Sequence, residues 1–152
     1  MAELYFEDVS VGQRFESAAY EISEEAIVAF AREFDVQAFH LDHAAAKESV
    51  FGGLAASGWH TAAVAMRLFT TGPLRFVGGI VGLGVDELRW PIAVRAGDSV
   101  RLETEIVEAR ASGSNPARGI LRIRNVLTNQ TGAVVLSYSA NAMVQRRPSA
   151  GG

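Results

Sequence analysis

The first half of the chain carries apolar residues at helical spacing, and the second half carries them in alternation. The first helical pattern covers residues 24–34 and has one apolar face. Ser23 precedes it as a candidate N-cap, and Glu24 and Glu25 lie in the first turn, where negative charge is favourable. The apolar face consists of Ile27, Phe30, Ala31 and Phe34. We therefore predict a helix over 24–34 and a loop over 35–41.

A second long helix is predicted over residues 57–69, and it is apolar on nearly every side. Its apolar residues include Ala62, Ala63, Val64, Ala65, Met66, Leu68 and Phe69. A helix that is apolar all round is normally buried, and this one spans roughly 20 Å at about 1.5 Å per residue. Between the two helices, Asp42 can cap a short helix over 43–49. Gly72 and Pro73 end the helical region.

Alternating apolar and polar residues predict strands on either side of the helical region. The predicted strands cover residues 13–22, 80–90, 100–106, 120–128 and 134–144. The strand over 80–90 has a break in its alternation near Asp86, which indicates a kink. Successive strands of this kind form an antiparallel sheet, and the long apolar helix needs a sheet that covers it. The sequence therefore predicts an α+β protein with the hot-dog fold, in which an antiparallel sheet wraps around a long central apolar helix.

The length and composition suit one globular domain. The chain has 152 residues, of which 49% are hydrophobic and 20% are charged, and this excludes wholesale disorder. We place the domain at residues 1–146 and expect the tail, 147–152, to be disordered. A net charge of −3 gives no electrostatic reason to expect a nucleic-acid partner.

The composition also limits chemistry and location. The chain contains no cysteine, so disulfides, cysteine-ligated metals and a cysteine nucleophile are excluded. The N-terminal residues show no signal-peptide pattern, and Arg67 interrupts the longest apolar segment before it reaches 18 residues. We expect a cytoplasmic protein with no membrane association.

Candidate chemistry is concentrated between residues 30 and 71. Asp35 supplies a carboxylate, His40 supplies an imidazole, and Gly58 lies at the start of the predicted apolar helix. The first N–H groups of a helix have no partners within it, and they can therefore bind an oxyanion. Spacing alone leaves an alternative open, in which Asp35 only ends a helix and His40 is a packed loop residue.

The segment around these residues resembles the MaoC-like dehydratases, the family that contains the (R)-specific enoyl-CoA hydratases. The family hallmark reads roughly D-x-N-P-x-H-x-D, and a later P-[IL]-x-H-G segment opens the central helix. The matching segments here are Asp35-Val36-Gln37-Ala38-Phe39-His40-Leu41-Asp42 and Leu54-Ala55-Ala56-Ser57-Gly58. Similarity continues through Gly-Val-Asp-Glu-Leu-Arg-Trp-Pro at 84–91 and Val-Arg-Ala-Gly-Asp at 94–98. This chain departs from the hallmark at three positions, where Gln37, Ala38 and Ser57 replace asparagine, proline and histidine.

The resemblance implies a function and a set of roles. The reaction would interconvert a 2-enoyl-CoA and an (R)-3-hydroxyacyl-CoA through a water activated by Asp35 and His40. The backbone N–H of Gly58 would bind the thioester oxygen. The resemblance further implies an acyl-CoA thioester as the substrate, no cofactor, and a homodimer or higher homo-oligomer. Two alternatives share the fold, namely an acyl-CoA thioesterase and a non-catalytic acyl-CoA binding protein.

Other polar residues near the motif receive weaker functional readings. Asp42, His43 and His60 could suggest a metal site together with His40, but we expect no metal, with Asp42 as an N-cap and His43 on the surface. His60 is a possible pocket residue, although a structural role is favoured. Gln37 and Ser57 are also possible pocket residues. No G-x-S-x-G elbow surrounds Ser57, so we expect an N-cap or a pocket hydrogen bond rather than a nucleophile.

Overall fold

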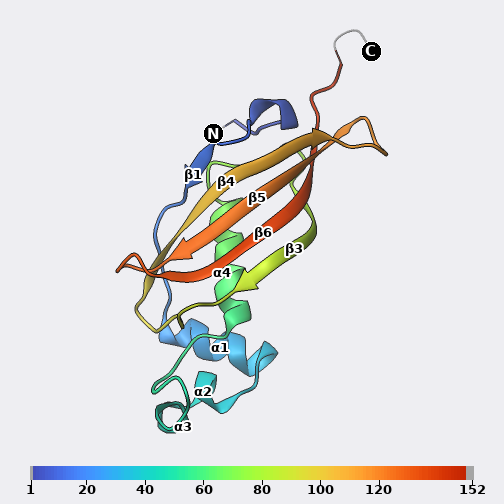
Figure 1. Ribbon diagram of the computed structural model, residues 1–152. Helices are drawn as coiled ribbons and strands as arrows, with labels where there is room; N and C mark the ends of the chain where they lie inside the picture. Colours follow the sequence, from blue (N-terminus) through green and yellow to red (C-terminus); the bar gives the residue numbers. More distant parts are fainter. Residues whose placement is uncertain (1, 150–152) are drawn as a thin grey trace.

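The computed structural model describes residues 2–149, which form a six-stranded sheet with helices on one face and at one end (Figure 1). The strands are β1 (Arg14–Glu16), β2 (Tyr20–Glu21), β3 (Val81–Arg89), β4 (Ser99–Ala111), β5 (Arg118–Thr128) and β6 (Val134–Gln145). Their order is β1-β4-β5-β6-β3, with β2 paired to another part of β4, and every pairing is antiparallel.

The helices separate into one long helix against the sheet and a group of shorter ones at its end. They are the 3-10 helix η1 (Phe6–Asp8), α1 (Glu24–Phe34), α2 (Ala38–Leu41), α3 (His43–Lys47) and α4 (Gly58–Thr70). Helix α4 lies behind the sheet in Figure 1, and α1, α2 and α3 gather near its N-terminal end. Ser23 caps α1 as predicted, because its hydroxyl accepts a hydrogen bond from the Ala26 N–H at 3.1 Å.

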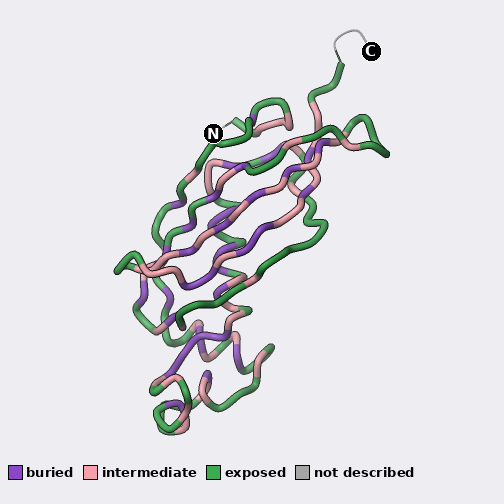
Figure 2. The backbone as a smooth tube through the Cα atoms, viewed as in Figure 1, coloured by how far each residue is buried: buried purple, intermediate pink, exposed green. Residues whose placement is uncertain are grey.

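Strand β5 and the first half of β4 bury every second residue, whereas β6 also buries neighbouring pairs, and Figure 2 shows these buried positions along the sheet. Most of the buried residues are apolar, and they form one core with the buried side of α4. A row of three polar residues crosses this core on neighbouring strands. The Thr104 hydroxyl donates to Asn125 Oδ1, and Asn125 Nδ2 donates to the Tyr138 hydroxyl at 3.0 Å. Burial raises the pKa of Tyr138, so its hydroxyl stays protonated at neutral pH.

The α+β hot-dog fold predicted from the sequence is confirmed, but α4 is not buried on every side. Val64, Ala65 and Leu68 face the core, whereas Trp59 and Met66 are 61% and 51% exposed. The sheet of one chain covers only one side of the helix. Beside it, β3 forms an edge of the sheet and is exposed over nearly its whole length (Figure 2).

Two strand predictions need correction. The single strand expected over 13–22 is replaced by the short strands β1 and β2. The Ser17 side chain accounts for the break, because its hydroxyl accepts the Leu102 N–H at 2.9 Å, in place of a backbone carbonyl. The strands after α4 are also not paired strictly in succession, because β3 pairs with β6, at the far edge from β1, rather than with the next strand along the chain, β4. The kink expected near Asp86 is confirmed by a register shift there and by a positive φ of 54° at Glu87.

Smaller differences concern the segment after α1 and the end of the chain. The loop expected over 35–41 contains the one-turn helix α2, and the helix expected over 43–49 ends at Lys47. In the tail, Arg147 forms an ion pair with Asp8 at 2.6 Å, and residues 150–152 lie outside the described residues. No helix within residues 2–149 is long and apolar enough to cross a membrane.

Candidate active site

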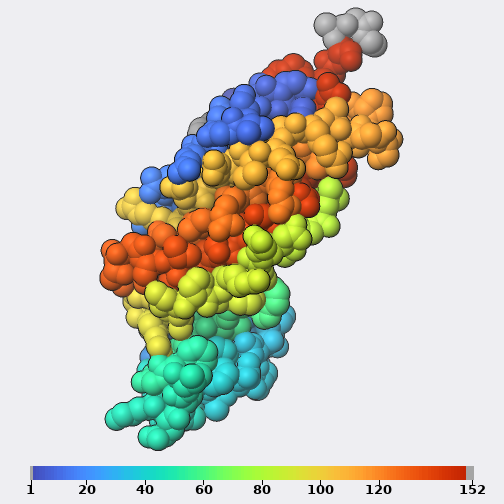
Figure 3. Space-filling model, in the orientation of Figure 1, coloured from blue at the N-terminus to red at the C-terminus, as the bar shows by residue number. Residues whose placement is uncertain are grey.

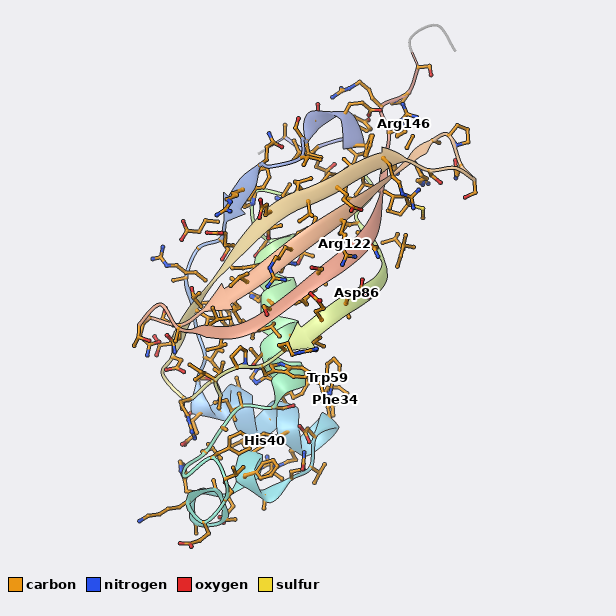
Figure 4. All side chains as sticks on the ribbon, viewed as in Figure 1. Phe34, His40, Trp59, Asp86, Arg122 and Arg146 are labelled. Atoms are coloured by element: carbon orange, nitrogen blue, oxygen red, sulfur yellow. The ribbon has the colours of Figure 1, made fainter. Side chains whose placement is uncertain are left out.

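A cleft of about 350 Å³ opens at the end of the molecule where α1, α2 and α4 meet the chain that follows β3. It is lined by Asp35, Gln37, Phe39, His40, Phe51, Ala56, Gly58, Trp59, Thr61, Trp90, Ile92, Ala93 and Val94. Figure 4 shows His40 among the short helices and Trp59 at the start of α4. The space-filling view shows this group of helices as a lobe that projects beyond the sheet (Figure 3). The structure thus brings Asp35, His40, Gln37 and Gly58 to one cavity.

Asp35 and His40 form a close pair because α2 turns the chain back after α1. Asp35 is the C-cap of α1 and His40 lies in α2. His40 Nε2 is 3.2 Å from Asp35 Oδ2, and the other ring nitrogen, Nδ1, is 2.5 Å from the Ala55 carbonyl oxygen. A carbonyl oxygen only accepts hydrogen bonds, so Nδ1 must carry a proton. The ring nitrogen left to exchange a proton is therefore Nε2, which faces the Asp35 carboxylate.

The Asp35 carboxylate is held in its ionised form. Its side chain is 18% exposed, whereas that of His40 is 5% exposed. Partial burial pushes the pKa of Asp35 upward, but hydrogen bonds from Ser57 and Gln37 and the charge of His40 outweigh it and place the pKa below its ordinary value. Gln37 Nε2 donates to Asp35 Oδ1 at 2.5 Å. The Gln37 amide, at the position where the family hallmark has asparagine, thus binds the carboxylate.

Gly58 begins α4, with Ser57 as its N-cap. Among the hydrogen bonds of residues 2–149, none uses the Gly58 N–H. The carbonyl of Gly58 accepts a bond from Trp90 Nε1 at 2.7 Å, and the Trp90 ring lies directly over the α-carbon. A Cβ added at Gly58 would lie 2.8 Å from Trp90 Cε2, so only glycine fits beneath this ring. The helix start therefore offers a free N–H donor, together with about half a positive charge from the helix dipole.

Two of the possible pocket residues lie outside the cleft wall. Ser57 is completely buried, and its hydroxyl accepts the Trp59 N–H at 3.3 Å. His60 stacks on Phe30 with ring centroids 4.9 Å apart. Its Nδ1 is buried without a hydrogen-bond partner, and burial lowers the pKa of His60. These contacts match the N-cap role expected for Ser57 and the structural role favoured for His60.

The remaining polar residues near the motif serve local structure. Asp42 caps α3 by accepting the Ala45 N–H at 2.8 Å, as predicted. His43 is exposed and contacts Glu24 at 2.5 Å. Within residues 2–149, no three histidine, aspartate or glutamate side chains come together in a geometry that could hold a metal ion.

Sequence reasoning missed much of the aromatic wall of this cleft. Phe39 and Phe51 pack edge to face at 5.1 Å, and Phe39 also packs against the His40 ring at 4.6 Å. Trp59 and Trp90 form a second edge-to-face pair at 5.3 Å. Phe39 lies inside the matched motif, but Phe51 and Trp90 are separated from it along the chain. Trp90 lies in the family-like segment over 84–91, but nothing in that similarity indicates that its side chain reaches the cleft, and Phe51 has no sequence signal beyond its aromatic side chain.

The geometry provides a low-pKa carboxylate, an imidazole with one exchangeable nitrogen, and an N–H donor at a helix start, all facing one cleft. Such a set can activate water, move a proton and stabilise an oxyanion. The fold and the cleft together define a hot-dog protein equipped for acid–base chemistry.

Comparison with known proteins gives the family. A family model described as a MaoC like domain matches residues 8–140, and the chain belongs to the MaoC-like dehydratase family. A MaoC-like dehydratase from Rhodospirillum rubrum has a similar structure, with a TM-score of 0.91 and 48% identity, over 96% of this chain and 99% of that one. The R-hydratase PhaJ1 from Pseudomonas aeruginosa gives a TM-score of 0.78 and 27% identity, over 95% of this chain and 88% of that one.

A mesaconyl-CoA hydratase from Cereibacter sphaeroides is 37% identical over 71 residues, which cover 47% of this chain and 20% of that protein. The chain spans less than half the length of the curated relatives it matches. These similarities place the chain in a family that contains hydratases.

Proposed function

We propose that this protein is a hydratase and dehydratase that interconverts a 2-enoyl-CoA and an (R)-3-hydroxyacyl-CoA. The observation that carries the proposal is the meeting of Asp35, His40 and the free Gly58 N–H in one cleft of a MaoC-like fold. The names of two similar proteins, an R-hydratase and a mesaconyl-CoA hydratase, support both the reaction type and a CoA thioester as the substrate.

The contacts of the dyad indicate how it would hold the attacking water. Nδ1 of His40 donates to the Ala55 carbonyl, so Nε2 is the ring nitrogen that faces the Asp35 carboxylate. A water that touches both groups would donate one hydrogen bond to Asp35 Oδ2 and the other to His40 Nε2.

Hydration then proceeds with balanced proton transfers. The water oxygen forms a bond to the β-carbon, and one water proton passes to Asp35 Oδ2. This proton moves over 3.2 Å to His40 Nε2, which delivers it to the α-carbon, where the electron pair of the former double bond collects. Asp35 and His40 are then back in their starting protonation states. Dehydration follows the same steps in reverse.

The Gly58 N–H acts on the thioester oxygen. Negative charge grows on this oxygen as water adds, because the carbonyl withdraws electrons from the double bond. A donor fixed at a helix start stabilises that charge, and loss of one such donor typically lowers kcat by about 10²–10³-fold. The bond from Trp90 to the Gly58 carbonyl holds this first residue of α4 in place.

The proposal is tested by following loss of the conjugated double bond of crotonyl-CoA and longer 2-enoyl-CoAs, with chiral analysis of the product. Asp35→Asn and His40→Gln should each lower kcat by about 10²-fold or more, since each removes one partner of the proton transfer. The matched controls are Asp42→Asn, at a helix cap, and His43→Gln, on the surface. Both controls should keep full activity.

Two outcomes would overturn the proposal. One is the absence of turnover with any enoyl- or hydroxyacyl-CoA of the panel. The other is release of free CoA thiol from acyl-CoAs, which would identify a thioesterase instead. Binding of CoA esters without turnover, unchanged by Asp35→Asn, would indicate a non-catalytic binding protein.

We also propose that two chains assemble as a homodimer. The open side of α4 exposes Met66, and the neighbouring edge strand β3 exposes Val81, Leu83 and Val85, each more than 50% accessible. The edge strand also presents unpaired backbone groups, which a second copy can satisfy by antiparallel pairing. Sedimentation of the purified protein tests this assembly, and a species with the mass of a single chain would contradict it.

A further inference from the structure

The guanidinium of Arg95 binds the backbone of the loop that leads from α3 to α4. Nη1 donates to the carbonyl oxygens of Gly53 at 2.8 Å and Leu54 at 3.3 Å, and Nη2 donates to that of Phe51 at 2.6 Å. Arg95 is half-buried, and none of the ion pairs among residues 2–149 includes it. A planar guanidinium with several fixed donors suits this task, because it binds several acceptors in one arrangement.

The loop that Arg95 binds is the part of the chain that orients His40. Directly after Leu54, the Ala55 N–H donates to the Phe39 carbonyl at 3.3 Å, and the Ala55 carbonyl accepts from His40 Nδ1 at 2.5 Å. At the other end of the loop, Phe51 packs against Phe39 in the cleft wall. Residues 52–57 form no helix or strand of their own. Their position therefore depends on contacts with neighbouring segments.

Arg95 is itself anchored to the sheet. Its backbone N–H donates to Asp98 Oδ2 at 2.8 Å, and Asp98 Oδ1 accepts from Gln130 Nε2 at 2.9 Å. The residue before it, Val94, accepts the Ala56 N–H at 2.9 Å. Hydrogen bonds thus link the turn after β5, through Arg95, to the Leu54 carbonyl, which directly precedes the residue whose carbonyl binds His40.

We infer that Arg95 is a positioning residue for the proposed reaction, acting through Ala55 on His40. By binding the Phe51, Gly53 and Leu54 carbonyls, Arg95 keeps the Ala55 carbonyl in the position where it accepts the hydrogen bond donated by Nδ1. This contact selects the tautomer in which Nε2 is free to exchange a proton with Asp35 and water. The inference rests on the proposed function for its kinetic consequence, but the effect on the imidazole tautomer is independent of any substrate.

The experiment compares Arg95→Met and Arg95→Lys with the wild type. In Arg95→Met, kcat should fall about 10- to 100-fold, since small displacements of a reacting group cost this much, while KM changes less. Lysine supplies a positive charge and three donors without the planar fork, so Arg95→Lys should recover part of the loss. Nitrogen NMR of the imidazole in the substrate-free protein should show Nδ1 protonated in the wild type and a mixture of tautomers in Arg95→Met.

The matched control is Arg146→Met, at the opposite end of the molecule from His40 in Figure 4. Arg146 also links separate segments, by an ion pair to Glu7 at 2.9 Å and a bond to the Pro116 carbonyl. Its loss should lower stability without changing kcat or the His40 tautomer. The inference is overturned if Arg95→Met is less stable but keeps wild-type kcat and an unchanged imidazole spectrum. If Arg95→Met does not fold, the imidazole spectrum of Arg95→Lys tests the inference in its place. If the wild type turns over no substrate, the proposed function fails, but the imidazole spectra still show whether Arg95 sets the tautomer of His40.

Discussion

Replacing Gly58 by alanine should disturb the start of α4 through a single steric contact. The added Cβ would lie 2.8 Å from Trp90 Cε2 and 2.9 Å from Trp90 Nε1, which is too close for either atom. Because the indole is rigid, the whole ring must move. Its bond from Nε1 to the Gly58 carbonyl, now 2.7 Å, would then be lost or lengthened.

The expected cost combines opposing effects on the free energy of unfolding. Loss of one hydrogen bond costs about 0.5–1.5 kcal/mol, and overpacking costs about 1–3 kcal/mol. The better helix propensity of alanine returns up to about 1 kcal/mol. We expect Gly58→Ala to be less stable by about 1–3 kcal/mol. We also expect kcat to fall at least about 10-fold, since the Gly58 N–H moves away from the thioester oxygen.

Urea unfolding and enoyl-CoA hydration kinetics measure the two effects. Gly113→Ala, in the exposed loop between β4 and β5, is the matched control, because a Cβ there meets no atom within 4 Å, and it should leave both quantities nearly unchanged. The decisive variant is Gly58→Ala combined with Trp90→Ala. If the clash is the cause, the double variant loses no more stability than Trp90→Ala alone. Additive losses in this cycle, or full activity of Gly58→Ala, would refute the reasoning.

Three further predictions concern the dyad, the core and the sheet edge. Folding lowers the pKa of Asp35, so its ionisation stabilises the protein above the pKa of the unfolded chain, and this contribution is lost on acidification. The stability difference between wild type and Asp35→Asn, measured by urea titration, should therefore shrink below about pH 4. Asn125→Leu leaves the Thr104 and Tyr138 hydroxyls without their partner, and denaturation should show a loss of about 2–4 kcal/mol. Leu83→Arg on the exposed edge strand should shift sedimentation toward single chains, whereas Val11→Arg, beside the opposite edge, should not.

The long helices and strands could be predicted from the sequence, because their helical spacing or alternation of apolar residues continues over many positions. Helices α1 and α4 contain 11 and 13 residues, and β5 and β6 contain 11 and 12, so their patterns are long enough to be recognised. Strand β4 was predicted only to residue 106 but continues to Ala111, because a register shift after Ile106 interrupts its alternation. Helix α2 has four residues and therefore no period to detect. The position of β3 beside β6 depends on where the connection over 90–98 takes the chain, and no local pattern encodes that path.

The candidate site shows the same division. Asp35, His40 and Gly58 were predicted because they belong to one motif, and Gln37 keeps the amide function that the motif requires. Trp90 and Arg95 lie 32 and 41 to 44 residues from the groups they bind, and each acts on a backbone carbonyl. A backbone carbonyl has no identity in the sequence. The residues that support the site therefore emerge only once the chain is folded.

The pairing of Trp59 with Trp90 also gives the molecule an optical property. The chain contains two tryptophans, and both line the cleft. Their indoles meet edge to face at 5.3 Å, beside the helix start that would bind the thioester. Ultraviolet emission excited in the indoles thus originates at the candidate site rather than throughout the core. Occupation of the cleft by a CoA ester would change that emission directly, so the affinity of the native, unlabelled chain can be read by titration without any turnover.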